Sequence, residues 1–201
     1  MTYQLIAQDF ATNFTYPDKF TFSSGNGLHY QLKGASTFAT SPDLITWTTR
    51  SWPAGLTSAV GNSFITFTDV VKLGSTYLIL VDIATVAVCA LTSTDGVTWT
   101  YNTTTLPSGY PQQYSLASNG TTFALVLGFS TSSYTSTNGT TWSAGTALGS
   151  GTFDGLNLVT LGSTFLMVRG TDAITSSNGS TWTVTAISGA VGGLIIAASN
   201  G

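Results

Sequence analysis

Residues Thr92–Thr100 read TSTDGVTWT, and nearly the same letters return at Thr135–Ser143 (TSTNGTTWS) and at Thr175–Thr183 (TSSNGSTWT). Each copy has the pattern S-x-[D/N]-G-x-T-W, with an Asp-Gly or Asn-Gly pair at its centre. Such a pair is a strong signal for a tight two-residue β-turn, because both central positions of that turn need a positive φ angle. Each copy therefore predicts a β-hairpin.

Two further segments resemble the motif less closely. Ser41–Trp47 (SPDLITW) has Leu44 in the glycine position, whereas Tyr16–Phe22 (YPDKFTF) has Lys19 in that position and Phe22 in place of Trp. A side chain resists the left-handed backbone that glycine supplies, so we expect a type I variant in both copies, with proline at its second position.

A second phrase, a turn followed by an apolar strand, precedes four of these copies; examples are Leu73–Leu80 (LGSTYLIL) and Leu161–Val168 (LGSTFLMV). Another apolar strand lies upstream of three of these phrases, so the repeat contains four strands. The aromatic position of the motif falls at Phe22, Trp47, Trp99, Trp142 and Trp182. The last two intervals are 43 and 40 residues, which matches the length of a four-stranded propeller blade.

The two ends of the chain complete the same pattern. Gly192–Gly201 resembles Tyr114–Gly120, a strand that ends in an Asn-Gly turn, and Met1–Ile6 resembles the strand that follows that turn. We therefore predict one all-β domain over residues 1–201, a β-propeller of about five four-stranded antiparallel blades. The N- and C-terminal strands pair in one blade, which removes the open edge. Four blades plus an irregular segment is the alternative, since the first two intervals, 25 and 52 residues, are uneven.

The composition excludes several classes of protein. Hydrophobic residues make up 42% of the chain, which is too many for a disordered chain, while charged residues make up only 6%. The net charge of −3 offers no basic surface for nucleic acid. The most apolar run, Tyr77–Leu91, is too short for a membrane helix and contains Asp82, and the N-terminus has no secretory signal. We expect neither nucleic-acid binding nor membrane insertion.

The motif resembles the Asp-box, S-x-D-x-G-x-T-W, of sialidase-like β-propellers, although it is one residue shorter. It is more similar to the shortened repeats of phage virion and tail-associated propeller proteins. In the Asp-box family the box is a structural turn away from the catalytic face, so the resemblance implies a structural role for the motif residues. These are Phe22, Trp47, Asp95, Gly96, Trp99, Asn138, Gly139, Trp142, Asn178, Gly179 and Trp182.

The inventory of reactive side chains argues against catalysis. The sialidase resemblance implies three arginines and a Tyr/Glu pair, but the chain has only Arg50 and Arg169 and no Glu. His29 is the sole histidine, so His-based metal clusters are excluded. Cys89 lies in an apolar strand without a cationic neighbour that would lower its pKa. We expect no catalytic residue, no metal and no cofactor.

Aromatic residues outside the repeat are free to contact a partner. The candidates are Trp52, Tyr101, Tyr110 and Tyr114, which stand among Ser, Thr and Asn; ordinary loop packing is the competing explanation for each. We expect a non-enzymatic phage virion protein of the tail or capsid surface that is exposed outside cells. Its expected partners are other virion proteins or further copies of itself, and surface glycans. The alternatives are a glycoside hydrolase or lyase with an Asp pair, and a free-standing lectin with one sugar site per blade.

Overall fold

The computed structural model describes residues 19–22, 27–33, 36–60, 65–83, 87–104, 106, 114–127, 132–148 and 158–188. Within these ranges the chain is all-β, with four antiparallel sheets and one short helix. Met1–Ile6 and Gly192–Gly201, to which we assigned the ring closure, lie outside the described part of the chain.

The four sheets follow one another in chain order. Sheet 1 contains β1 (Lys19–Phe22), β2 (His29–Lys33), β3 (Thr37–Ser41) and β4 (Thr48–Ser51). Sheet 2 contains β5 (Ile65–Phe67), β6 (Val71–Leu73), β7 (Thr76–Ile83), β8 (Ala87–Ser93) and β9 (Thr100–Thr103). Sheet 3 contains β10 (Tyr114–Ser118), β11 (Phe123–Leu127), β12 (Ser133–Ser136) and β13 (Ser143–Ala144). Sheet 4 contains β14 (Val159–Leu161), β15 (Thr164–Arg169), β16 (Asp172–Ser176) and β17 (Thr183–Ala186).

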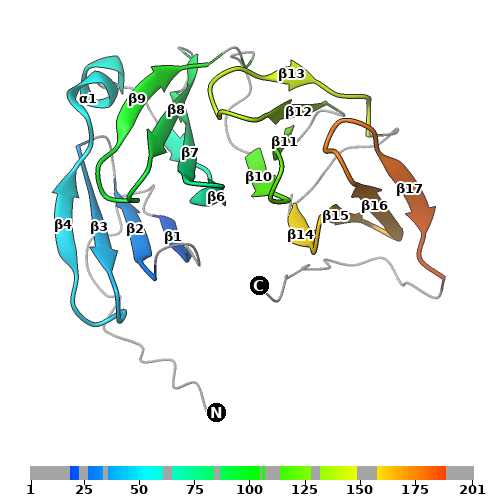
Figure 1. Ribbon diagram of the computed structural model, residues 1–201, viewed down its shortest axis with the longest axis horizontal. Helices are drawn as coiled ribbons and strands as arrows, with labels where there is room; N and C mark the ends of the chain where they lie inside the picture. The colour runs from blue at the N-terminus through cyan, green and yellow to red at the C-terminus, as the bar shows by residue number, and fades with distance from the viewer. Residues whose placement is uncertain are drawn as a thin grey trace.

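The sheets are arranged along an arc (Figure 1). The first strands of the sheets lie on the inside of the arc, where β10 contacts both β6 and β14, and the last strands lie on the outside. Each sheet pairs its strands in the order in which the chain makes them. This meander is the four-stranded repeat predicted from the sequence.

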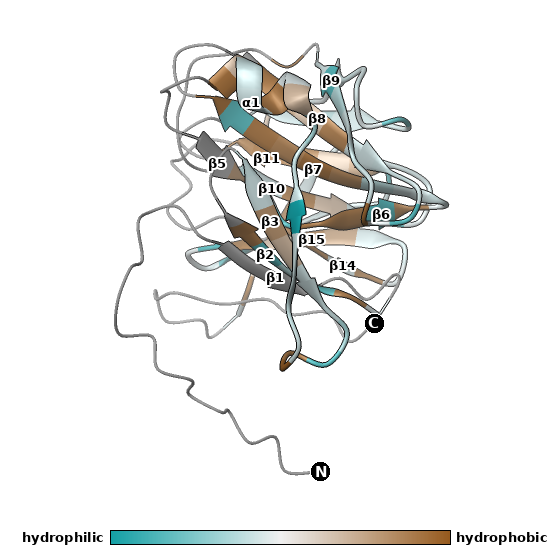
Figure 2. Cartoon of the chain, turned by 90° about the vertical axis from the view of Figure 1, so that its left-hand side faces the viewer, coloured by the Kyte–Doolittle hydropathy of each residue, from teal (hydrophilic) through white to brown (hydrophobic). Residues whose placement is uncertain are grey.

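A hydrophobic core fills each space between neighbouring sheets. The first core joins sheets 1 and 2, the second joins sheets 2 and 3, and the third joins sheets 3 and 4. Strand β7 is buried on both faces, since Tyr77 and Ile79 lie in the first core while Leu78 and Leu80 lie in the second. Residues Tyr77–Val81 of this strand are therefore a continuous apolar run without polar alternation (Figure 2).

The inner edge of sheet 2 is interrupted. The sequence predicts one strand from Ser63 to Val71, but the structure has two short strands, β5 and β6, that both pair with β7. Thr68 lies in the gap and its side chain replaces the missing ladder bond: the amide of Leu80 donates to Thr68 Oγ1 at 2.9 Å. The amide of Thr68 donates to the Leu80 carbonyl at the same distance. The interruption therefore leaves neither buried amide unpaired.

The motif hairpin differs from the predicted two-residue turn. Strand β8 ends at Ser93 and β9 begins at Thr100, and of this motif's residues only Gly96 has a positive φ angle, +73°. Side chains replace the backbone turn: Asp95 Oδ1 accepts the amides of Val97 and Thr98, each at 2.7 Å. A longer loop held by its own side chains is therefore the correct description.

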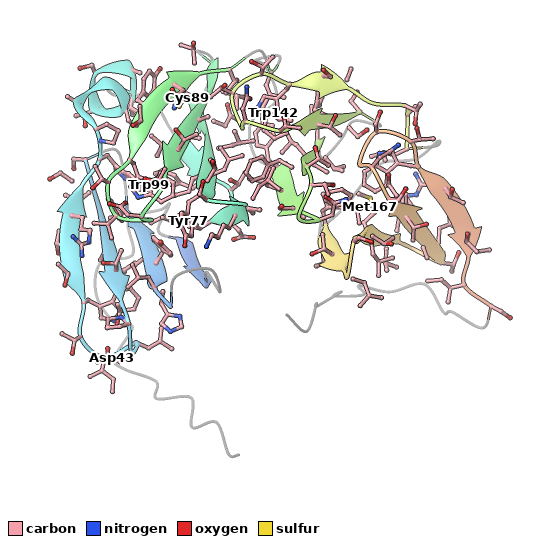
Figure 3. All side chains as sticks on the ribbon, viewed as in Figure 1. Asp43, Tyr77, Cys89, Trp99, Trp142 and Met167 are labelled. Carbon is pink, nitrogen blue, oxygen red and sulfur yellow. The ribbon has the colours of Figure 1, made fainter. Side chains whose placement is uncertain are left out.

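Sheet 1 forms the same loop without a glycine, contrary to the type I turn that we expected. Leu44 has φ +63° and is the one non-glycine residue with a positive φ in the described ranges. Asp43 Oδ1 accepts the amides of Ile45 and Thr46 at 2.9 and 2.7 Å, as its counterpart does in sheet 2. These bonds hold Leu44 in a conformation that costs a leucine about 1–2 kcal/mol. Asp43 lies at the tip of the β3–β4 hairpin (Figure 3).

The prediction of a fifth motif copy at Phe22 is wrong. Lys19–Phe22 is strand β1, which pairs with β2 as the inner strand of sheet 1. In the other copies the corresponding residues form the loop, and Trp47, Trp99, Trp142 and Trp182 each precede the last strand of their sheet. The alignment matched an alternating aromatic strand with a loop of similar composition.

The segment between sheets 1 and 2 contains a helix that we did not predict. Helix α1 (Ala54–Val60) follows Pro53, whose carbonyl accepts the amides of Leu56 and Thr57. Leu56 and Val60, four residues apart, are buried in the first core. Proline at the start and this spacing are the features of a short amphipathic helix.

Candidate functional site

An open groove of about 490 Å³ lies between the last strand of sheet 1 and the motif loop of sheet 2. Its lining consists of hydroxyl groups, one guanidinium and apolar ring edges, without a carboxylate: Thr49, Arg50, Ser51, Trp52, Pro53, Val97, Thr98 and Trp99. We call this the arginine groove. It contains Trp52, one of the residues predicted to bind a partner, and Trp99, one of the motif residues.

Trp52 is not the exposed aromatic contact that the sequence predicts. Its side chain is 4% exposed and stacks on Phe38, with ring centroids 4.1 Å apart. The ring of Phe67 lies on Trp52 as well, at 5.7 Å. Trp52 is therefore a member of the first core that contributes only to the wall of the arginine groove.

Arg50 is held in a defined orientation in this groove. It lies directly opposite Phe38 in the β3–β4 pair, and its Nε donates to Thr40 Oγ1 at 2.9 Å. Among the described residues this is the only hydrogen bond of its guanidinium, and no carboxylate pairs with it. The two Nη groups are therefore available to an acceptor from outside the chain.

Trp99 is 6% exposed, and three aromatic rings meet it edge to face: Tyr30, Phe38 and Trp52. Its indole Nε1–H has no hydrogen-bond partner within the described part of the chain. The corresponding tryptophans differ, because Trp142 Nε1 donates to the Gly139 carbonyl and Trp182 Nε1 donates to Ser133 Oγ, each at 3.0 Å. Figure 3 places Trp99 and Trp142 between neighbouring sheets.

A second groove, of about 370 Å³, lies beside the first and is lined almost wholly by hydroxyl groups. We call it the threonine groove; its lining is Thr76, Thr92, Ser93, Thr94, Thr98, Thr100, Asn138 and Thr140. Thr98 lines both grooves, so the two are contiguous across the motif loop of sheet 2.

The predicted tyrosines are scattered. Tyr101 is partly buried against the first core, where its ring would lie 3.0 Å from a Cβ placed on Gly55 of α1. Tyr114 packs against the second core. Tyr110 lies outside the described residues. The structure does not bring Trp52, Tyr101 and Tyr114 together as one contact surface.

Tyr114 is instead the partner of a buried carboxylate. Asp82, in β7, is 6% exposed, and burial raises its pKa while the Tyr114 hydroxyl donates to it. Burial raises the pKa of the Cys89 thiol to about 12, and the charge of Asp82 adds to this. No second carboxylate in the described ranges contributes to the pKa of Asp82, so an acid and base pair is not assembled there.

The motif acids are exposed and fully engaged in their loops. The amide of Thr98, followed by that of Val97, lowers the pKa of Asp95 well below its ordinary value. In sheet 1 the amides of Thr46 and Ile45 lower the pKa of Asp43 to about 2. Asn138 and Asn178 accept the same pair of amides without a charge. The loop therefore needs the oxygen acceptor and not the carboxylate.

This comparison predicts the result of replacing Asp95 by asparagine. The loop should persist at pH 7, and the acid sensitivity of folding should fall. A carboxylate with a depressed pKa in the folded state stabilises above its unfolded pKa of about 4, and that contribution is lost as the pH falls through the folded pKa. Thermal unfolding between pH 7 and pH 2 should show the wild type losing stability relative to the variant below about pH 4. Parallel pH profiles would contradict this.

The described residues offer neither a metal centre nor a membrane-spanning helix. They contain no group of three or more His, Cys, Asp or Glu side chains able to hold a metal ion. No helix in these ranges has the length and apolar character to cross a membrane.

Arg50 is the candidate binding residue that sequence reasoning missed. Arg169 has an acidic residue three positions later, and the pair lies 3.6 Å apart in the structure. The acidic residue nearest to Arg50 in the sequence is Asp43, seven positions earlier. The absence of an acidic residue close to Arg50 in the sequence was the feature that could have identified it as a candidate binding residue.

No protein-family model and no curated protein matches the chain. Among solved structures, the chain is similar to the crystal structure of a GH74 enzyme from Niastella koreensis, with 16% sequence identity and a TM-score of 0.37. The match covers 79% of this chain and 29% of that enzyme.

Proposed function

We propose that this protein is a non-enzymatic β-propeller module that binds glycans and forms part of a phage virion, in the tail or on the capsid surface. The virion assignment rests on the resemblance of the motif. The glycan assignment rests on the contiguous arginine and threonine grooves, whose linings offer many hydroxyl groups and no carboxylate. Hydroxyl groups both donate and accept hydrogen bonds, which suits a polyhydroxylated ligand.

Glycan binding is tested by blocking the arginine groove from its rim. Ser51 is exposed and lines the groove, so the side chain of Ser51→Trp should fill it. Retention on a glycan array should fall about tenfold or more, because a few well-placed contacts carry most of the binding energy of an interface. Thr103→Trp is the matched control, because Thr103 ends β9 as Ser51 ends β4 and lies outside both grooves.

An array that retains no glycan, or equal retention by both variants, would refute the assignment. The virion assignment is tested separately by a pull-down with the tagged protein from a lysate of the source culture. Virion proteins should be enriched, and their absence would leave a free-standing lectin as the better description.

We also propose that the arc of sheets is part of a closed ring of five blades, completed by residues 1–18 and 189–201. The motif glycines of sheets 3 and 4 pack against the preceding sheet, Gly139 on Leu78 and Gly179 on Ala124. The matching loop of sheet 1 leaves Leu44 and Ile45 46% and 69% exposed. A fifth blade would cover this apolar loop.

Ring closure predicts a specific disulfide. Alignment with sheet 3, where Ala117 pairs with Ala124, places Ala198 opposite Gln4. The double variant Gln4→Cys/Ala198→Cys should therefore form an intramolecular disulfide under mild oxidation, since strand partners lie within bonding reach. Cys89 will not compete, because it is buried and its thiol pKa is raised to about 12.

The control pair is Gln4→Cys/Ala190→Cys, which the alignment places out of register. Non-reducing electrophoresis and mass spectrometry of proteolytic fragments distinguish the linked from the open chain. Equal cross-linking of the two pairs, or none in either, would count against the ring.

A further inference from the structure

Arg50 differs from the other cationic side chains that the structure describes. Arg169 forms an ion pair with Asp172, and Lys72 lies 4.9 Å from the centre of the Tyr77 ring. Arg50 has neither with any residue in the described ranges, although it is partly buried. A partly buried cation without a counter-charge loses hydration and gains no ion pair in return, so it favours an anion from outside.

The guanidinium is also prepared for an anion. The hydrogen bond from Nε to Thr40 Oγ1 fixes one edge of its plane and leaves the two Nη groups to donate. Two parallel N–H groups match the two oxygens of a carboxylate or of a sulfate ester. The arginine is thus oriented before a ligand arrives.

The side chains that line the rest of the arginine groove include hydroxyl groups and no carboxylate, while the adjoining Asp95 carboxylate accepts the amides of Val97 and Thr98. Trp99 contributes its ring to the groove wall, and its buried indole N–H has no acceptor in the described part of the chain. Thr49, Ser51 and Thr98 contribute hydroxyl groups to the lining. On a protein with a net charge of −3, this groove is a local site for an anion that also carries hydroxyl groups.

We propose that the arginine groove binds an acidic sugar unit, with its carboxylate or sulfate group on the Nη atoms of Arg50 and its hydroxyl groups on the groove rim. The proposal rests on the glycan-binding function and names the class of glycan. It predicts that the free sugar acid binds better than an uncharged sugar of the same shape, and that binding weakens as ionic strength rises.

The experiment uses methyl glucuronide and its uncharged methyl ester as probes, titrated into ¹⁵N-labelled wild-type protein. The indole signal of Trp99, identified by its loss in Trp99→Phe, should shift with the glucuronide. Arg50→Gln should weaken glucuronide binding about tenfold or more, because a bidentate charged hydrogen bond is lost. Arg50→Lys should fall in between, and Arg169→Gln, which removes the same charge elsewhere, should bind as the wild type does.

A titration with sodium sulfate alone shows whether the groove binds any free anion or requires the sugar as well. The free anion should bind at least tenfold more weakly than the glucuronide; equal binding would overturn the proposal. Equal binding of the glucuronide and its ester, or an unchanged affinity in Arg50→Gln, would overturn it too.

These results are separable from the fate of the proposed function. Neutral glycans retained on the array by wild type and Arg50→Gln alike would leave the glycan-binding function standing and refute the acidic ligand. An Arg50-dependent shift with glucuronide, together with an array that retains nothing, would support the acidic site and refute the broader function.

Discussion

Replacement of Gly179 by alanine is expected to lower the free energy of unfolding by about 2–4 kcal/mol, the sum of backbone strain and overpacking. Gly179 has φ +71°, and a Cβ there would lie 2.8 Å from Ala124 Cβ and 3.0 Å from Thr135 Cγ2. Both neighbours belong to sheet 3, so relief of the contact requires the two sheets to separate.

Gly162→Ala is the matched control. Gly162 has φ +61°, but a Cβ there would meet no heavy atom within 4 Å. This variant should lose only the strain of the left-handed backbone, about 1–2 kcal/mol. Urea unfolding of the two variants measures the difference, and equal losses would show that the contact with sheet 3 adds nothing.

The second large effect concerns the motif tryptophans. Trp142→Phe should cost about 1–3 kcal/mol more than Trp99→Phe, because it breaks a buried hydrogen bond to the Gly139 carbonyl while the Trp99 N–H has no bond to lose. The two substitutions remove the same atoms from buried positions, so the comparison reports the hydrogen bond against the ring contacts, of which Trp99 makes three.

Thermal or urea unfolding of both variants gives the comparison, with Trp182→Phe as a third case. Trp182 donates to Ser133 Oγ, a side chain of the neighbouring sheet that can turn to another partner, so its loss should lie between the other two. A larger loss in Trp99→Phe than in Trp142→Phe would mean that the Trp99 indole has a partner after all.

Much of the fold could be predicted because individual strands and turns are marked in the local sequence. The four-stranded antiparallel meander follows from glycine turns and apolar runs that recur at regular intervals. The motif loop was misread for a physical reason: the Asp95 side chain supplies acceptors that a two-residue turn would take from the backbone. The residues of the motif alone do not distinguish a two-residue turn from a longer loop held by side-chain hydrogen bonds.

Burial of individual aromatic residues was harder to predict. Trp52 stands among polar residues, and the sequence left partner contact and loop packing both open. The fold packs its ring on Phe38 and Phe67, which lie in different sheets. Phe22 was aligned with the tryptophans because an alternating strand and the motif share spacing. The arginine groove could not be predicted from the sequence, because Arg50 and Trp99 belong to different sheets and meet only in the folded chain.

The packing of Gly139 and Gly179 on the preceding sheet bears on how such a chain can evolve. Gly139 lies against Leu78 and Gly179 against Ala124, so sheets 3 and 4 are each fitted to the sheet before them. Nearly identical motifs invite recombination within the gene, yet exchange of sheet 3 with sheet 4 would place the Gly179 loop on Leu78 instead of the smaller Ala124. An exchange of these two repeats would therefore require a compensating change at the side chain that the glycine contacts.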